Sequence, residues 1–226
     1  MMADQPIKTS LRLQHIEQMV IKQYEHIWDC CCDHGLLGFN LLNKHCADIV
    51  HFVDIVPQLL IDIEIRLSKH WQGDPDSWQV HCCDVAQLPL LPSSKNDQHL
   101  VIIAGVGGEL MIELLKGLQV SFKGGNVEYI LCPVHHNYKV RAYLSAQQFA
   151  LIDESLIIEN KRGYEILHVS TKGDNALSLV GSLMWDLNNR EHLNYLQQTI
   201  KHYQRIAQNP AIDITNIIEQ YQQLLV

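Results

Sequence analysis

The sequence predicts an open α/β domain of the doubly wound, Rossmann-like type, and two observations carry that prediction. Five short apolar runs alternate with stretches in which apolar residues recur three or four positions apart. The first pattern is typical of buried strands and the second of helices that cover a sheet. Strands that alternate with helices form a parallel sheet, here with helices on both faces.

The five apolar runs are the expected strands, and they span residues 26–31, 48–54, 78–84, 99–105 and 127–133. Helical spacing predicts helices over residues 9–22, 36–45, 57–70, 108–118 and 137–148. Thr9 and Ser10 at the start of the first helix are residue types that suit an N-cap.

After Phe149 the pattern changes to two strands within residues 151–171, around a turn expected at residues 161–163. Such a pair is antiparallel. A parallel sheet that ends in an antiparallel pair at one edge is the usual ending of the class I methyltransferase fold. The expected sheet therefore has seven strands and is mostly parallel.

Beyond Lys172 the chain is expected to be helical. Two apolar stripes run along it, and they consist of Leu193, Leu196, Ile200, Tyr203 and Ile206, then Ile214, Ile217, Ile218, Tyr221 and Leu224. Asn209 and Pro210 separate the stripes, which favours two antiparallel helices that pack on each other like a coiled coil. The alternative is that these helices only cap the sheet. We expect a methyltransferase-type domain over residues 1–172 and a two-helix appendage over 173–226.

Composition limits the possible classes. With 226 residues and 47% hydrophobic residues, the chain can build a large core. Its first residues lack the apolar segment of a signal peptide, and no apolar run reaches the roughly 20 residues of a membrane span, so we expect a cytoplasmic protein. The expected oligomeric state, which no feature of the sequence fixes, is a monomer or a weak dimer. The formal charge of −8 disfavours a general nucleic-acid binder, although local basic patches can still bind one.

The cysteines are expected to be reduced and mostly packed in the core. Five of the seven occur as the runs CCC and CC. Neighbouring residues of a strand point to opposite faces, so these runs lack the spacing of a zinc site, and no metal is expected.

Polar residues follow the expected strands at the edge where open α/β sheets bind ligands. Asp29 and Asp33 flank the three cysteines after the first strand, Asp54 ends the second, and Asp84 ends the third. An acid in the position of Asp54 can accept hydrogen bonds from both ribose hydroxyls of an adenosine. Asp84, with Val85 after it, is placed to meet the adenine amine. Together these positions favour an adenosine-containing cofactor.

The first loop distinguishes among such cofactors. A dinucleotide needs a glycine-rich loop to bind its pyrophosphate. This loop reads DCCCDHGLLG, and it carries two aspartates and no lysine or arginine. S-adenosylmethionine has a sulfonium cation and no phosphate, so an acidic loop suits it. The alternative, a nicotinamide-dependent dehydrogenase, is disfavoured by the missing glycines.

Several segments together resemble the bacterial family of tRNA adenine-N1 methyltransferases that act on the D-loop region. They are DCCCDHGLLG, Asp54, HCCDV, IAGVGGELMIELL, LCPVHHNYKVRAYL and RGYEILHV, and they extend over almost the whole chain. The resemblance implies S-adenosylmethionine bound at the first loop, Asp54 and Asp84, with tRNA approaching over the strand ends. Two departures concern Cys31, where the family has glycine, and Cys132 with Val134, where the family has Gln and Asn.

The resulting site prediction has three parts. The catalytic candidates are Asp33 and His34. The cofactor candidates are Asp29, Cys31, Asp33, Asp54, Asp84, Val85, Ala104, Gly105, Gly107 and Gly108. The RNA candidates, mostly cations that could share one face, are Lys8, Arg12, Pro133, Lys139, Arg141, Lys161 and Arg162.

The residues after the fourth expected strand indicate which atom of the substrate accepts the methyl group. Enzymes of this fold that methylate an exocyclic amine tend to carry [DNS]-P-P-[YFW] there, whereas this chain has Ala-Gly-Val-Gly. Adenine N1 has an in-plane lone pair, so positioning matters more than a strong base. Asp33 could stabilise the charge that develops on the base, or could only cap the next helix. His34 could be structural, and one of His135 and His136 is expected to be packed. A non-catalytic RNA-binding or scaffold protein of the same fold is the remaining alternative.

Overall fold

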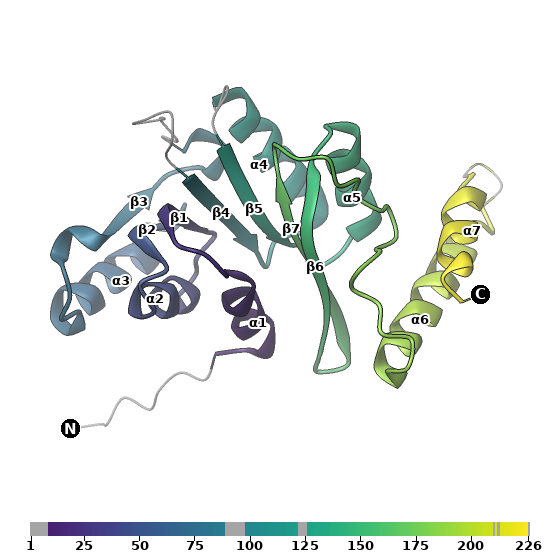
Figure 1. Ribbon diagram of the computed structural model, residues 1–226, viewed down its shortest axis with the longest axis horizontal. Helices are drawn as coiled ribbons and strands as arrows, with labels where there is room; N and C mark the ends of the chain where they lie inside the picture. The colour runs from purple at the N-terminus through teal and green to yellow at the C-terminus, as the bar shows by residue number, and fades with distance from the viewer. Residues whose placement is uncertain (1–8, 89–97, 122–125, 210, 212, 226) are drawn as a thin grey trace.

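A seven-stranded sheet forms the centre of the computed structural model, which describes residues 9–88, 98–121, 126–209, 211 and 213–225 (Figure 1). The strand order is β3-β2-β1-β4-β5-β7-β6. Neighbours from β3 to β5 are parallel, while β7 is antiparallel to both β5 and β6. The predicted fold class is confirmed.

The strands are β1 (Tyr24–Cys30), β2 (Ala47–Asp54), β3 (Trp78–Cys82), β4 (Gln98–Ala104), β5 (Asn126–Cys132), β6 (Ala150–Glu159) and β7 (Arg162–Ser170). The α-helices are α1 (Leu11–Met19), α2 (Leu36–Asn43), α3 (Pro57–His70), α4 (Gly108–Ser121), α5 (Asn137–Ala146), α6 (Arg190–Ile206) and α7 (Thr215–Gln223). Two short 3₁₀ turns, η1 (Pro75–Ser77) and η2 (Val85–Gln87), flank β3.

The sheet has a separate hydrophobic core on each face. Leu41 of α2, Ile63 of α3 and Ile16 of α1 fill one core. Met111 and Leu115 of α4, with Leu144 of α5, fill the other. These side chains are 0% exposed, and their three- and four-residue spacing on each helix is the pattern that identified the helices in the sequence.

Local chemistry sets two of the boundaries. The Ser10 hydroxyl accepts a hydrogen bond from the Leu13 N–H, so Ser10 is the N-cap of α1, as the sequence predicted. The turn between β6 and β7 lies earlier than the predicted residues 161–163. Its central residues are Asn160 and Lys161, with φ of 51° and 63°. Positive φ at both positions matches the twist of a two-residue hairpin, and asparagine tolerates that conformation well.

The two C-terminal helices pack on each other at one end of the sheet (Figure 1). Leu196 and Ile200 of α6 and Tyr221 of α7 are buried in a third, small core. The Tyr203 and Tyr221 rings stack with centroids 5.7 Å apart. The prediction of a mutually packed pair is confirmed, and the helices do not cover a face of the sheet.

A fully buried arginine ties this end of the molecule together. Arg141 of α5 is 0% exposed and donates hydrogen bonds to Glu165 at 2.8 Å and to Glu154 at 2.6 Å. It also donates to the Ser178 carbonyl at 3.0 Å. Glu154 in turn accepts from the Leu183 N–H at 2.6 Å. The segment between β7 and α6 is therefore fastened to the sheet by charge-assisted hydrogen bonds.

A row of imidazoles crosses four strands on one face of the sheet. His51 of β2 contacts His26 of β1 and His81 of β3 through its two ring nitrogens, at 3.0 and 2.9 Å. The Trp28 ring stacks on His51 at 3.7 Å, and its N–H donates to His99 of β4 at 3.2 Å. Burial, followed by the neighbouring imidazoles, lowers the pKa of His51 to about 2, so this ring is neutral at physiological pH.

No helix in the described parts of the chain combines the length and apolar character that crossing a membrane requires.

Candidate active site

A cavity of about 350 Å³ opens at the carboxyl ends of β1 and β4. It is enclosed by the start of α1, the loop between β1 and α2, and the turn after β4. Its lining residues are Arg12, Leu13, Asp29, Cys30, Cys31, Cys32, Asp33, His34, Leu36, Leu37, Ala104, Gly105 and Val106. The structure thus brings the predicted residues of the first loop together with Ala104 and Gly105, whereas Asp54, Asp84, Gly107 and Gly108 do not line this cavity.

Backbone hydrogen bonds fix the first loop in an unusual conformation. Cys31, Asp33 and Gly35 have positive φ values of 56°, 51° and 68°. The Cys32 N–H donates to the Val53 carbonyl at 3.2 Å, and the Gly35 N–H donates to the Cys32 carbonyl at 2.7 Å. Positive φ is unfavourable for a cysteine, so the loop conformation is maintained by these bonds rather than by local preference.

Asp29 is a buried carboxyl at the floor of the cavity. It is 4% exposed, and its Oδ2 accepts a hydrogen bond from the Gly38 N–H at 2.8 Å. Burial raises the pKa of Asp29 to about 7, with the Asp54 carboxylate acting in the same direction and the Gly38 bond against it. A group that is half ionised near neutrality can respond to a cation brought into the cavity.

Asp54 ends β2 as predicted, whereas β3 ends at Cys82 and Asp84 lies two residues beyond it. Both acids accept hydrogen bonds from backbone N–H groups. Asp54 accepts from the Asp33 N–H at 3.2 Å and from the Val56 N–H at 3.1 Å, so it couples the first loop to β2. Asp84 is exposed and caps η2 by accepting from the Ala86 N–H at 2.9 Å. A carboxylate oxygen accepts more than one hydrogen bond, so both acids retain capacity for a ligand. Val85 is 3% exposed and its side chain packs in the core, so only its backbone can contact a ligand, and its place at the cofactor stays a prediction.

These carboxylates surround Cys31 and keep its thiol protonated. Burial, followed by Asp54, Asp29 and Asp84, raises the pKa of Cys31 to about 11. Cys30, Cys32 and Cys132 are buried, as expected for core residues, whereas Cys82 is exposed. No group of three histidine, cysteine or acidic side chains among the described residues is arranged to hold a metal ion.

Asp33 and His34 project from the loop into solvent. Their side chains are 74% and 58% exposed, and Asp33 Oδ1 lies 3.7 Å from His34 Nε2. The N-cap of α2 is Gly35, in the left-handed conformation and without a side-chain hydrogen bond. The alternative that Asp33 caps this helix is therefore wrong, and its carboxylate is accessible at the mouth of the cavity.

The glycine turn after β4 is shaped by the loop after β5. A Cβ atom at Gly107 would lie 2.5 Å from the His135 ring, so only glycine permits this approach. The Gly108 N–H donates to the His135 carbonyl at 3.1 Å, and the Val134 N–H donates to the Val106 carbonyl at 2.9 Å. Both His135 and His136 are exposed, which corrects the prediction that one of them is packed.

Arg12 belongs to the cavity wall rather than to an outer basic patch. Its guanidinium lies over the Tyr164 ring, with its central carbon 4.9 Å from the centroid. Its Nε–H is buried and has no hydrogen-bond partner among the described residues. A buried donor without a partner is costly, which makes Arg12 a strong candidate to bind an anionic group of a ligand. The sequence could not signal this, because α1 approaches the strand ends only in the folded chain.

The predicted RNA residues do not form one patch. Arg141 is buried and ion-paired, and Pro133 is buried too, so neither is available to RNA as predicted. Lys161 and Arg162 are exposed at the β6–β7 turn. Lys139 is exposed and pairs with Glu109 at 2.8 Å. Lys8 lies outside the described residues.

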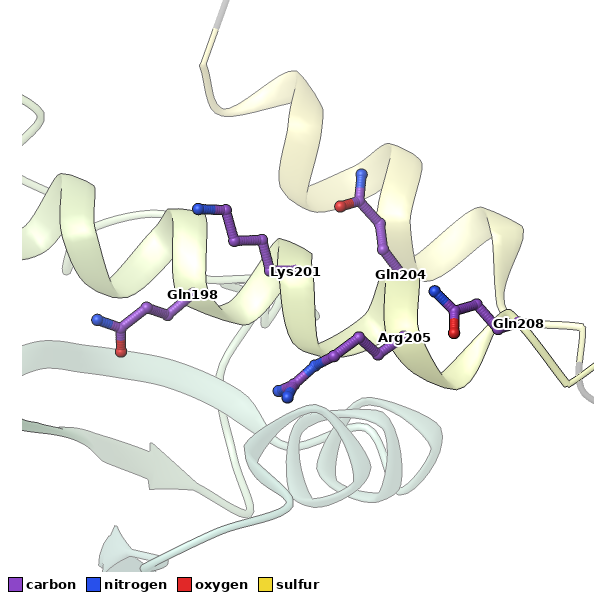
Figure 2. A pocket seen from close by; sticks show the side chains of 5 residues that line it. All are labelled: Gln198, Lys201, Gln204, Arg205 and Gln208. Atoms are coloured by element: carbon purple, nitrogen blue, oxygen red, sulfur yellow. The ribbon is translucent and has the colours of Figure 1, made fainter.

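A second, polar groove runs along α6, which sequence reasoning did not identify (Figure 2). It is lined by Gln198, Lys201, Gln204, Arg205 and Gln208. Figure 2 shows Arg205 and Gln198 extending from α6 on the side of the sheet domain. Two cations and three amides without an acid make this groove suitable for phosphate and sugar oxygens.

Comparison with known proteins agrees with this geometry. A family model described as a methyltransferase domain matches residues 9–167, and the chain therefore belongs to that family. This confirms the predicted methyltransferase and goes against the dehydrogenase alternative.

The similar proteins point in the same direction. The chain is 27% identical to a Mycoplasma pneumoniae protein named as a candidate tRNA methyltransferase, over 70% of each chain. It is 30% identical to the Bacillus subtilis tRNA (adenine(22)-N(1))-methyltransferase, over half of each chain. These names confirm the resemblance inferred from the sequence motifs.

A solved structure supports the fold over the full chain. The structure of M. capricolum TrmK in complex with S-adenosyl-homocysteine superposes with a TM-score of 0.73 at 18% identity. The match covers 96% of this chain and 97% of that one. It therefore includes the C-terminal helices as well as the sheet.

Proposed function

We propose that this protein is an S-adenosylmethionine-dependent methyltransferase that acts on N1 of an adenine in tRNA. The observation that carries the proposal is the charge pattern of the cavity after β1 and β4. Arg12, whose buried Nε–H has no hydrogen-bond partner among the described residues, lines this cavity together with two acids, Asp29 and Asp33. The cofactor combines a carboxylate with an ammonium and a sulfonium cation, so these residues fit it.

Each end of the cofactor has a candidate partner in this chain. Arg12 is suited to the carboxylate of the methionine part, because its Nε–H is buried and has no partner in the described parts of the chain. Asp29 and Asp33 are suited to the ammonium and sulfonium charges. Asp54 and Asp84, at the ends of β2 and β3, are placed for the ribose hydroxyls and the adenine amine.

The loop between β1 and α2 also provides a residue, Asp33, that can act on the adenine during methyl transfer. The bound cofactor supplies an electrophilic methyl group, which the N1 lone pair takes as the carbon–sulfur bond breaks and its electrons remain on sulfur. The adenine becomes cationic in this step. The exposed Asp33 carboxylate at the cavity mouth can stabilise that charge, which is the usual source of large rate effects. No strong base is needed because N1 carries no proton to remove.

Relatives named for tRNA methylation support RNA as the substrate. The groove on α6 supplies cations, Lys201 and Arg205, that the net charge of −8 conceals (Figure 2). A cytoplasmic location accords with such a substrate. The division of the chain at residue 172 and the monomeric or weakly dimeric state stay predictions.

The decisive experiment is mass spectrometry of nucleosides from unmodified tRNA incubated with the protein and methyl-labelled S-adenosylmethionine. We expect labelled 1-methyladenosine, and we expect Asp33→Asn to transfer methyl at least about 100-fold more slowly while it stays folded. A different labelled nucleoside would show that N1 of adenine is not the acceptor. Absence of transfer would favour the alternative of a non-catalytic scaffold protein.

Calorimetry tests the cofactor site without turnover. We expect Arg12→Gln to weaken S-adenosyl-homocysteine about tenfold or more and to leave 5′-methylthioadenosine, which lacks the amino acid, unchanged. Arg162→Gln, an exposed arginine on the β6–β7 hairpin, is the matched control. Equal weakening of both ligands would place Arg12 away from the carboxylate.

A further inference from the structure

A further cavity of about 350 Å³ lies between the sheet domain and the C-terminal helices. The loop after β5 contributes His135 and His136, the start of β7 contributes Glu165, and α6 contributes Tyr195 and His202. Its volume lies in the range of small-molecule sites, roughly 300–1,000 Å³. None of the sequence motifs includes the residues from α6.

Flat rings dominate this interdomain cavity. The His135 and His136 rings meet edge to face at 4.4 Å, and His202 meets Tyr203 in the same way at 5.3 Å. Tyr195 packs so closely over Gly163 that a Cβ atom there would lie 2.3 Å from its ring. Rings held in this way are the usual platforms on which proteins stack unpaired bases.

The interdomain cavity also has polar groups that suit the edge of a base. The Asn137 amide donates to Glu165 Oε1 and to the Tyr195 hydroxyl, both at 3.1 Å, and Tyr195 donates to Glu165 at 2.9 Å. These bonds fix Asn137, yet its Oδ1 is buried and has no donor among the described residues. An acceptor in this state is satisfied by an N–H group, and each of the four RNA bases presents one on its Watson–Crick edge.

The position of the interdomain cavity relates it to the methyl-transfer site. His135 lines it and also packs against Gly107 of the turn after β4. Gly105 and Val106 of the same turn line the cofactor cavity. The two cavities are therefore separated by two adjoining loops. Arg205 and Gln198 line both the interdomain cavity and the α6 groove, which continues the polar surface outward (Figure 2).

We infer that the interdomain cavity binds an unstacked nucleobase of the RNA, next in the chain to the adenine that is methylated. This inference rests on the proposed RNA methyltransferase function. Turning an adenine out of a stack unstacks its neighbour as well, and a ring-lined site beside the first cavity compensates for that cost. Arg205 is placed to hold the phosphate of the same nucleotide.

A double-mutant cycle between protein and RNA tests the inference. The probes are tRNA transcripts that carry an abasic residue on the 5′ or the 3′ side of the methylated adenine, bound in the presence of S-adenosyl-homocysteine. We expect His202→Ala to weaken the intact transcript about tenfold, the scale of one lost base–ring stack. We expect one of the two abasic transcripts to bind wild-type protein equally weakly.

Binding of the abasic transcript by the His202→Ala variant tests whether the two changes remove the same contact. We expect His202→Ala to bind that abasic transcript no more weakly than the intact one, because the two changes remove the same contact. Gln197→Ala, an exposed α6 residue outside both the groove and the cavity, is the control and should match the wild type. Additive losses, or unchanged binding by His202→Ala, would overturn the inference while methyl transfer by wild-type protein persists. Absence of transfer by wild-type protein to any tRNA would instead refute the proposed function, and the inference with it.

Discussion

Two groups of buried carboxyls in this protein have the same chemistry and opposite roles. Asp29 lies at the floor of the cavity after β1 and β4, where it forms no ion pair with a cation of the described residues and burial raises its pKa to about 7. Glu154 and Glu165 flank the buried Arg141, and there the arginine lowers the pKa of Glu154 even though burial acts strongly in the other direction. Burial without a cation leaves a carboxyl ready to receive one, whereas burial with a cation makes it a structural element.

Removing the cation from the second group should give the largest effect. Arg141→Met leaves two buried carboxylates without their partner, and we expect it to lower the free energy of unfolding by about 3–5 kcal/mol. Urea denaturation at pH 7.5 measures this. Arg162→Met, on the exposed hairpin, is the control and should change stability by less than about 0.5 kcal/mol. A loss below about 1 kcal/mol for Arg141→Met would show that the ion cluster does not hold the domain together.

A substitution at Asp29 should raise the stability of the folded protein, whereas the substitution at Arg141 lowers it. The pKa of Asp29 is raised from 3.8 to about 7, so the folded state loses stability as the pH rises through that interval. Asp29→Asn keeps the acceptor for the Gly38 N–H and cannot ionise. We expect it to be more stable than wild type at pH 8, by at most about 4 kcal/mol, and equally stable below the unfolded-state pKa, near pH 3.

Urea denaturation of both proteins across this range provides the measurement. A constant difference between them at all pH values would mean that the ionisation of Asp29 is not suppressed in the folded protein.

The row of histidines sharpens the comparison with a smaller effect. Folding lowers the pKa of His51 from 6.5 to about 2, so stability is complete above 6.5 and is lost as the pH falls below it. Between pH 7.5 and 5.5 we expect His51 to account for a loss of about 1.3 kcal/mol. His51→Gln should lack this part of the loss. Comparison of the two proteins at each pH removes the contribution of Asp29, and parallel curves would contradict the assignment.

The sequence predicted the fold because its signals are local. Alternating strands and helices, and the antiparallel pair after Phe149, determine the sheet whatever the rest of the chain does. The acids at the strand ends were found for the same reason, since parallel strands of one sheet end at a common edge. The sequence analysis placed the hairpin turn too late in the chain. The turn is centred on Asn160 and Lys161, which adopt positive φ, and lysine is not a residue type that indicates this conformation.

The arginines could not be assigned in that way. Arg12 and Arg141 both occur in helices, between Leu11 and Leu13 and between Val140 and Ala142, and nothing local distinguishes them from surface arginines. Their roles depend on Tyr164, Glu154 and Glu165, which reach them only through the folded sheet. A cation in a sequence indicates charge but neither burial nor partner. Both arginines were predicted to bind RNA; the burial of Arg141 rules this out, whereas Arg12 lines the cavity after β1 and β4.

The fastening of residues 178–184 has a consequence for synthesis of the chain. A ribosome completes all seven strands before it makes Ser182 and Leu183, whose N–H groups bond to Glu154. Until then Glu154 and Arg141 lack the backbone groups of residues 178–183 that bond to them when they are buried. The nascent domain can therefore form its sheet early, but it closes this edge only after the segment leading to α6 has emerged. A chain ended at residue 172 would remain in that unfinished state.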